Sequence, residues 1–144
     1  MSSDSADSPH AAPNGAPTIL LVENDSLVTP VMAEALSDAG YRSICVTTID
    51  EAWEALQSGP VDVVVSDLHL GADLRSDEFA DALTLLARIR ADPAHRAIPF
   101  IVASGNRRKD TIQLAMNAGA ADYLIKPFPP SELLAGIRQC LTAK

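Results

Sequence analysis

Side chains that could bind a metal ion or neutralise a phosphoryl group follow short apolar runs of this 144-residue sequence. They are Glu23, Asn24 and Asp25 after the first run, Asp67 after the third, Ser104 after the fourth and Lys126 after the fifth. Each residue alone has an ordinary structural explanation, such as capping a helix or making a turn. Together they supply carboxylates, an amide, a hydroxyl and an ammonium, a set able to hold Mg²⁺ and to balance phosphoryl charge.

The apolar runs alternate with segments of helical spacing, five times along the chain. The sequence predicts strands at residues 18–22, 43–47, 61–66, 99–103 and 122–125. It predicts helices at residues 27–39, 50–58, 79–90, 108–117 and 131–141, with Ser26 and Ser131 as N-caps of the first and last. The central strands are continuously apolar, which is typical of strands buried on both faces. We therefore expect an α/β fold, a doubly wound parallel five-stranded sheet whose ligands bind at the carboxyl ends of the strands.

Composition limits the classes of function. A net charge of -8 argues against a direct nucleic-acid binder, and the absence of a long apolar stretch argues against a membrane span. Residues 1–17 are rich in Ser, Asp, Ala and Pro without the features of a signal peptide, so we expect a disordered leader before one domain at residues 18–144.

The two cysteines lack the number and spacing of a disulfide scaffold or a zinc site. Cys45 and Cys140 lie among apolar residues, so we expect buried free thiols and a cytoplasmic protein. His95 lies in a polar segment, and we expect its ring in solvent.

Four segments in order carry a resemblance to a known family. They are Ile19 to Asn24, Val61 to Asp67, Pro99 to Gly105 and Ala121 to Pro127. Together they resemble the CheY-like receiver domain of bacterial response regulators over about residues 18–142. The resemblance implies a flavodoxin-like (βα)5 sheet with strand order 2-1-3-4-5.

The resemblance also implies roles for the matched residues. Asp67 is the expected phosphoacceptor, and the expected Mg²⁺ ligands are Glu23, Asn24, Asp67 and the main-chain carbonyl of His69. Ser104 and Lys126 would contact the phosphoryl group, and Tyr123 would change rotamer on activation. The implied protein is a two-component signalling module, not an enzyme. It would be phosphorylated by a histidine kinase or phosphotransfer protein and would present a face of helix four, strand five and helix five to an unknown target.

Two features depart from the family pattern. Asn24 stands where an acid normally provides a Mg²⁺ ligand, so we expect weaker Mg²⁺ binding. The stretch 68–78 is longer than usual and could be a lid, a partner-specific loop, an extra helix or an inert insertion. The bond between Lys126 and Pro127 is a candidate cis peptide.

Three other interpretations stay open. Asn24 favours a pseudo-receiver that works without phosphorylation, whereas Asp67, Ser104 and Lys126 favour a stand-alone phosphorylated receiver. The chain could also be a receiver fragment of a larger regulator or hybrid kinase. An enzyme on the same sheet is disfavoured, because we find no Gly-rich phosphate loop and no nucleophile elbow.

Overall fold

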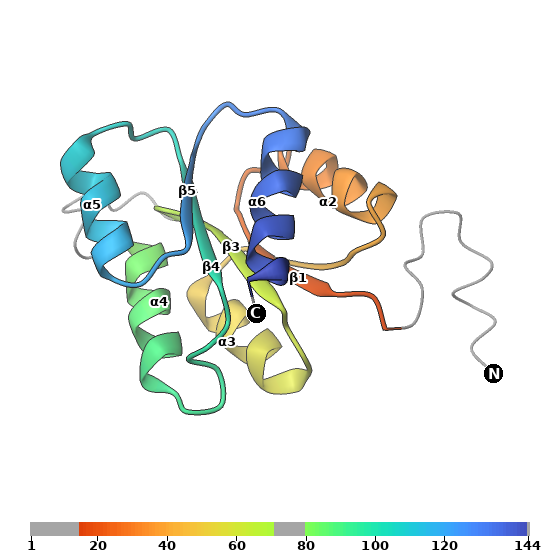
Figure 1. The fold of residues 1–144 in the computed structure, drawn as a ribbon, viewed down its shortest axis with the longest axis horizontal. Helices are drawn as coiled ribbons and strands as arrows, with labels where there is room; N and C mark the ends of the chain where they lie inside the picture. The colour runs from red at the N-terminus through yellow and green to blue at the C-terminus, as the bar shows by residue number, and fades with distance from the viewer. Residues whose placement is uncertain (1–14, 71–79, 144) are drawn as a thin grey trace.

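Five parallel strands form one sheet in the computed structural model, in the order β2–β1–β3–β4–β5 (Figure 1). The structure describes residues 15–70 and 80–143. The strands are β1 (Thr18–Val22), β2 (Arg42–Val46), β3 (Val63–Asp67), β4 (Phe100–Ser104) and β5 (Asp122–Ile125). This arrangement confirms the predicted α/β class and strand order. The order reverses between β1 and β3, which is the position where such sheets bind ligands.

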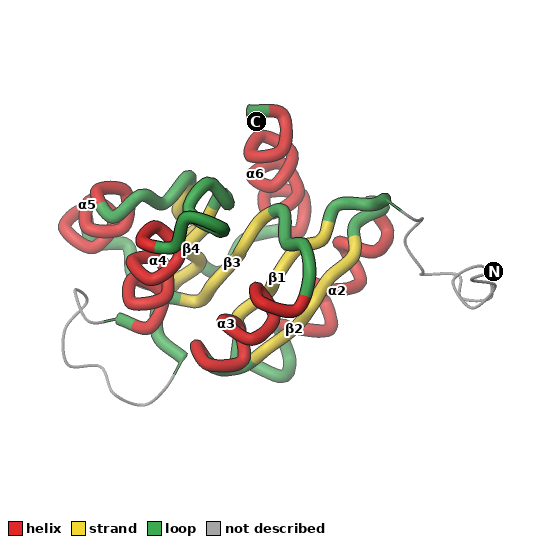
Figure 2. Tube along the Cα trace, turned by 90° about the horizontal axis from the view of Figure 1, so that it is seen from below, coloured by secondary structure: helices red, strands yellow, loops and turns green. Residues whose placement is uncertain are grey.

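The helices cover both faces of the sheet, as Figures 1 and 2 show. They are α2 (Thr29–Asp38), α3 (Ile49–Ser58), α4 (Asp81–Ala91), α5 (Lys109–Asn117) and α6 (Pro130–Thr142). One buried cluster packs α3, α4 and α5 against the sheet, and a second packs α2 and α6 against the other face. The alternate side chains of β1 show this division, because Leu20 belongs to the first cluster and Leu21 to the second.

Helix starts depart from the sequence prediction at both serine caps. Ser26 does not cap α2, because the carboxylate of Asp25 accepts from the main chain of Leu27 and forms a turn before the helix begins at Thr29. Helix α6 begins at Pro130, one residue before the expected start at Ser131. Proline suits the first helical turn, where its missing N–H leaves no bond unmade.

The structure corrects the predicted burial of one of the two cysteines. Cys140 is buried in the second cluster as expected, but Cys45 is exposed. Cys45 lies on β2, an edge strand whose neighbours cover it less than the central strands are covered.

Two predictions concern residues that the structure describes only in part. The expected leader falls mostly on residues 1–14, and most of the long 68–78 stretch falls on residues 71–79; both segments lie outside the described residues. Across the described ranges, none of the helices has the length and apolar character needed to cross a membrane.

Candidate functional site

Three charged side chains meet at the carboxyl ends of the strands. Glu23 follows β1, Asp67 ends β3 and Lys126 follows β5. The ammonium of Lys126 lies 2.6 Å from Oε1 of Glu23 and 3.4 Å from Oδ2 of Asp67. The structure therefore brings together residues that are 103 positions apart in sequence. The Lys126–Pro127 bond is cis, as the sequence suggested.

The electrostatic environment separates the roles of these groups. Burial raises the pKa of Asp67 to about 6 from an ordinary value of 3.8, and the negative charge of Glu23 adds to the rise while Lys126 opposes it. Burial alone would lower the pKa of Lys126, but its hydrogen bond to Glu23 and the two nearby negative charges raise the pKa instead. At neutral pH the site therefore holds a carboxylate that is mostly ionised beside a protonated lysine.

A chain of hydrogen bonds connects the predicted switch residues. Ser104, 6% exposed at the end of β4, accepts at its hydroxyl oxygen from the main-chain N–H of Asn106 at 3.0 Å. The carbonyl of Asn106 accepts from the Tyr123 hydroxyl at 2.7 Å. Ser104 and Tyr123 are thus joined through the main chain of one residue, Asn106, and sequence reasoning gave no signal for the part that Asn106 plays.

Asn24 occupies its predicted place beside Glu23 but makes a contact that its sequence position did not suggest. Its side-chain amide donates to the main-chain carbonyl of Leu70. The N–H of Leu70 in turn donates to Oδ2 of Asp81, the first residue of α4, at 2.6 Å. His69 lies directly before Leu70, in the segment that follows Asp67. Leu70 and Asp81 were both missed by the sequence analysis.

The oxygen-rich donor set fits a hard divalent cation such as Mg²⁺. Glu23 and Asp67 offer carboxylates, and the carbonyl of His69 and the amide oxygen of Asn24 offer neutral oxygens. The described residues hold no group of three or more His, Cys, Asp or Glu side chains that could bind a metal. Two carboxylates would therefore have to supply the negative charge for a cation here.

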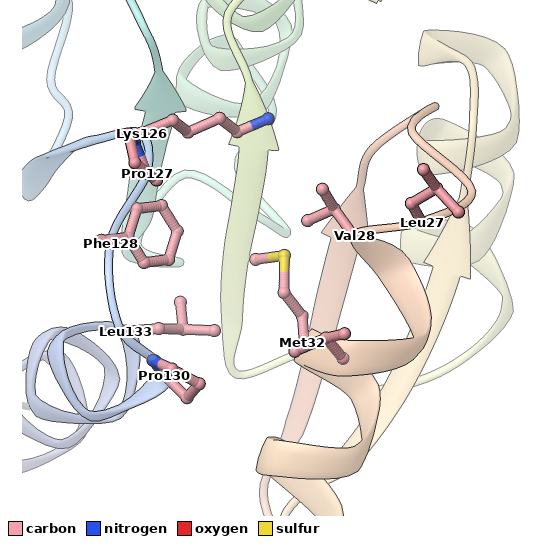
Figure 3. Close-up of a pocket in the computed structure, with 9 residues that line it drawn as sticks. Leu27, Val28, Met32, Lys126, Pro127, Phe128, Pro130 and Leu133 are labelled. Atoms are coloured by element: carbon pink, nitrogen blue, oxygen red, sulfur yellow. The ribbon is translucent and has the colours of Figure 1, made fainter.

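An apolar groove of about 280 Å³ opens beside Lys126 (Figure 3). Val28 and Met32 approach it from the side of α2, and Pro127, Phe128 and Leu133 line the other side (Figure 3). Two further lining residues on the α2 side stand far into solvent: Leu27 is 83% exposed and Val31 is 58% exposed.

Three basic residues form a cluster at the start of α5. Arg107, Arg108 and Lys109 are all exposed there, and Arg108 lies 3.9 Å from the carboxylate of Asp110. Because exposed ion pairs of this kind contribute little to stability, the pair gives the cluster no clear role in holding the fold together.

Known proteins are similar to this chain in sequence and in fold. The family model described as the response regulator receiver domain matches residues 19–138. The transcriptional regulatory protein KdpE of Staphylococcus aureus is 38% identical over 123 residues, which cover 83% of this chain and 48% of that protein. The chain spans about half the length, or less, of the curated relatives that it matches.

Solved structures agree with the family match. A response regulator from Thermotoga maritima has a TM-score of 0.75 and 27% identity, covering 88% of this chain and 98% of that one. The receiver domain of the sensor histidine kinase PA1611 from Pseudomonas aeruginosa has a TM-score of 0.76 and 26% identity, covering 89% and 99%. That structure is described with a magnesium ion coordinated in its active-site cleft.

Proposed function

Because this chain belongs to the response regulator receiver domain family, we propose that it accepts a phosphoryl group on Asp67 from a histidine kinase or a histidine phosphotransfer protein. The observation that carries the proposal is the position of Asp67. Its carboxylate ends a buried central strand, lies 3.4 Å from Lys126 and is ionised at neutral pH.

In the proposed step, a carboxylate oxygen of Asp67 attacks phosphorus in line with the donor histidine. The new O–P bond forms as the P–N bond breaks, and the leaving imidazole keeps the electron pair of the broken bond. The ammonium of Lys126 offsets the repulsion between two anions. Bound Mg²⁺ would supply further positive charge beside the phosphoryl group, and Glu23, Asp67, the amide oxygen of Asn24 and the His69 carbonyl would hold it.

The proposed switch follows from the hydrogen bonds of Ser104. An aspartyl phosphate adds charge and acceptor oxygens that attract the Ser104 hydroxyl. Moving that hydroxyl changes its bond with Asn106, and Asn106 is the residue that holds the Tyr123 hydroxyl. The altered surface would comprise α5, β5 and α6, where a protein target would distinguish the two states.

The groove beside Lys126 supports a docking place for the protein that donates the phosphoryl group. A donor whose histidine reaches Asp67 must cover the surface around Lys126, and Lys126 also lines the groove. Exposed Leu27 and Val31 then provide apolar contact area next to the reacting atoms.

Incubation with acetyl phosphate and Mg²⁺, followed by intact-mass measurement, tests the acceptor. We expect the mass of one phosphoryl group to be added to the native chain and none to be added to Asp67→Asn. Equal labelling of the two chains would remove Asp67 from the role. Ser104→Ala should still be labelled, while its NMR response at Tyr123 to phosphorylation or beryllofluoride becomes smaller than the native response.

A phosphorylation-independent interaction module is the second candidate function. It is favoured by one observation, that the Asn24 amide is engaged with Leu70 in place of an acidic metal ligand. For that function, acetyl phosphate would leave both the mass and the NMR spectrum around Tyr123 unchanged. The chain also spans less than half the length of these relatives, which fits the receiver portion of a larger regulator.

A further inference from the structure

The segment after Asp67 is held from two sides at one residue. The carbonyl of Leu70 accepts from the Asn24 amide, and its N–H donates to Asp81 at 2.6 Å. The side chain of Leu70 is only 8% exposed and belongs to the core cluster under α3 and α4. Both main-chain polar groups of Leu70 are therefore satisfied by side chains from other elements, one from the end of β1 and one from α4.

The same segment is also fixed at its beginning. The N–H of Leu68 donates to Oδ1 of Asp67 at 3.0 Å, and the carbonyl of Leu68 accepts from the N–H of Ala82 at 3.0 Å. His69 lies between these two anchored residues. In the described part of the chain, this segment is held by side-chain hydrogen bonds with Asn24, Asp67 and Asp81. Of these three, the bond of Asn24 is the one that comes from the β1 end of the site.

The contact with Leu70 depends on an amide at position 24. An amide nitrogen donates hydrogen bonds, whereas an ionised carboxylate can only accept them. Aspartate at this position would therefore place a negative oxygen against the carbonyl oxygen of Leu70. It would also add a third carboxylate to Glu23 and Asp67, opposed by the single ammonium of Lys126.

We propose that Asn24 and Asp81 are positioning residues, which hold the segment 68–70 in place at the phosphoryl site before any cation binds. In this chain the amide hydrogen bond links the β1 end of the site directly to the main chain of Leu70. The carbonyl of His69 is then ordered without Mg²⁺. This inference rests on the proposed function for its relevance to phosphoryl transfer, but the ordering itself is a property of the resting chain.

Amide hydrogen exchange of Leu70, followed by NMR with and without Mg²⁺, tests this role. In the native chain we expect slow exchange that Mg²⁺ leaves within about twofold. Asn24→Ala should speed the exchange roughly fivefold to tenfold with or without Mg²⁺, the factor that one lost hydrogen bond of ordinary strength gives. Asn24→Asp should exchange as fast without Mg²⁺ and return toward the native rate with it, because a bound cation would offset the charge of the added carboxylate.

Two controls keep the result specific. Exchange at Val65 in β3 should not change in any variant, which shows that the sheet is intact, and Gln57→Ala, an exposed side chain on α3, should leave Leu70 unaffected. Asp81→Ala should speed exchange at Leu70 directly, because it removes the acceptor of that N–H.

The inference is overturned if Asn24→Ala leaves Leu70 exchange within twofold of native, or if Mg²⁺ slows that exchange strongly in the native chain. Phosphorylation of the same variants is scored separately by mass. Failure of Asp67 labelling with the expected exchange pattern would reject the proposed function alone. Normal labelling with unchanged exchange would reject the positioning role alone.

Discussion

Burial beside a second carboxylate makes the ionised form of Asp67 unfavourable in the folded chain. Its pKa of about 6 lies above the ordinary value of 3.8, so the native state holds a proton between these pH values that the unfolded state has already lost. A raised pKa of an acid means that this group's contribution to the free energy of unfolding increases as pH falls through about 6 and is least favourable at neutral pH and above.

We therefore predict that Asp67→Asn stabilises the chain in Mg²⁺-free buffer. At about pH 7 the free energy of unfolding should rise by about 1–3 kcal/mol, since the uncharged amide avoids the cost of a buried charge. The gain should shrink as pH falls toward about 5, where the native carboxyl is protonated. Urea unfolding of both chains across this pH range measures the difference, and a gain that stays constant with pH would contradict the electrostatic cause.

At the scale of elements, Arg90 joins three segments that no strand pairing connects. Its guanidinium, near the end of α4, donates to the carbonyls of Arg96 at 2.9 Å, Ile98 at 2.7 Å and Gly119 at 2.8 Å. These carbonyls belong to the turn before β4 and the turn before β5. One planar side chain thus joins α4 to the turns that lead into β4 and β5, at the amino ends of these strands.

Arg90→Lys should lower the free energy of unfolding by about 1–3 kcal/mol, because a lysine ammonium lacks the forked donors that reach three carbonyls together. Arg138→Lys, an exposed position on α6, is the matched control and should change stability little. Chemical denaturation of the two variants compares them. Equal stability of the two would show that the three hydrogen bonds contribute nothing measurable.

The elements were predictable from sequence to the extent that their signals are local. Strands β1 and β5 have the predicted bounds, because apolar runs between polar residues define them. The tertiary contacts were not predictable in this way. Leu70 meets Asn24 from 46 positions away, and His95, expected in solvent, lies with its ring nitrogens 2.6 Å from Asp92 and 3.0 Å from the Leu56 carbonyl.

The site residues illustrate the same division. Glu23, Asp67, Ser104 and Lys126 were found because parallel strands end at one edge, so their successors must be neighbours. Their pairing was not found, since the closer contact of Lys126 with Glu23 than with Asp67 depends on side-chain packing. Asn106 carried no signal because its contribution to the switch residues is made by main-chain atoms.

At the scale of the whole molecule, the proposed docking role of the groove beside Lys126 can be tested by comparing a protein donor with a small one. We predict that Leu27→Ser combined with Val31→Ser slows phosphoryl transfer by about tenfold or more from a histidine kinase that phosphorylates the native chain, because a docked partner loses apolar contact area. Labelling by acetyl phosphate should stay at the native rate, since a small donor does not need the groove. Transfer rates from both donors, measured by radiolabel, make the comparison.

The matched control is Leu114→Ser, a partly exposed apolar side chain on α5, which covers the other face of the sheet. It should affect neither donor. Equal slowing by the control, or slowing with acetyl phosphate as well, would mean that the groove variants act through the fold and not through docking.

The span of the site along the chain also has a consequence for its synthesis. Glu23 comes from the first strand and Lys126 follows the last, so their contact exists only when the sheet has its fifth strand. A polypeptide still leaving the ribosome can pair β1 with β2 and β3, yet it lacks the ammonium that contacts Glu23 and Asp67. On the proposed function, competence to receive a phosphoryl group would therefore arise only after residue 126 has left the ribosome, in one step that completes the sheet.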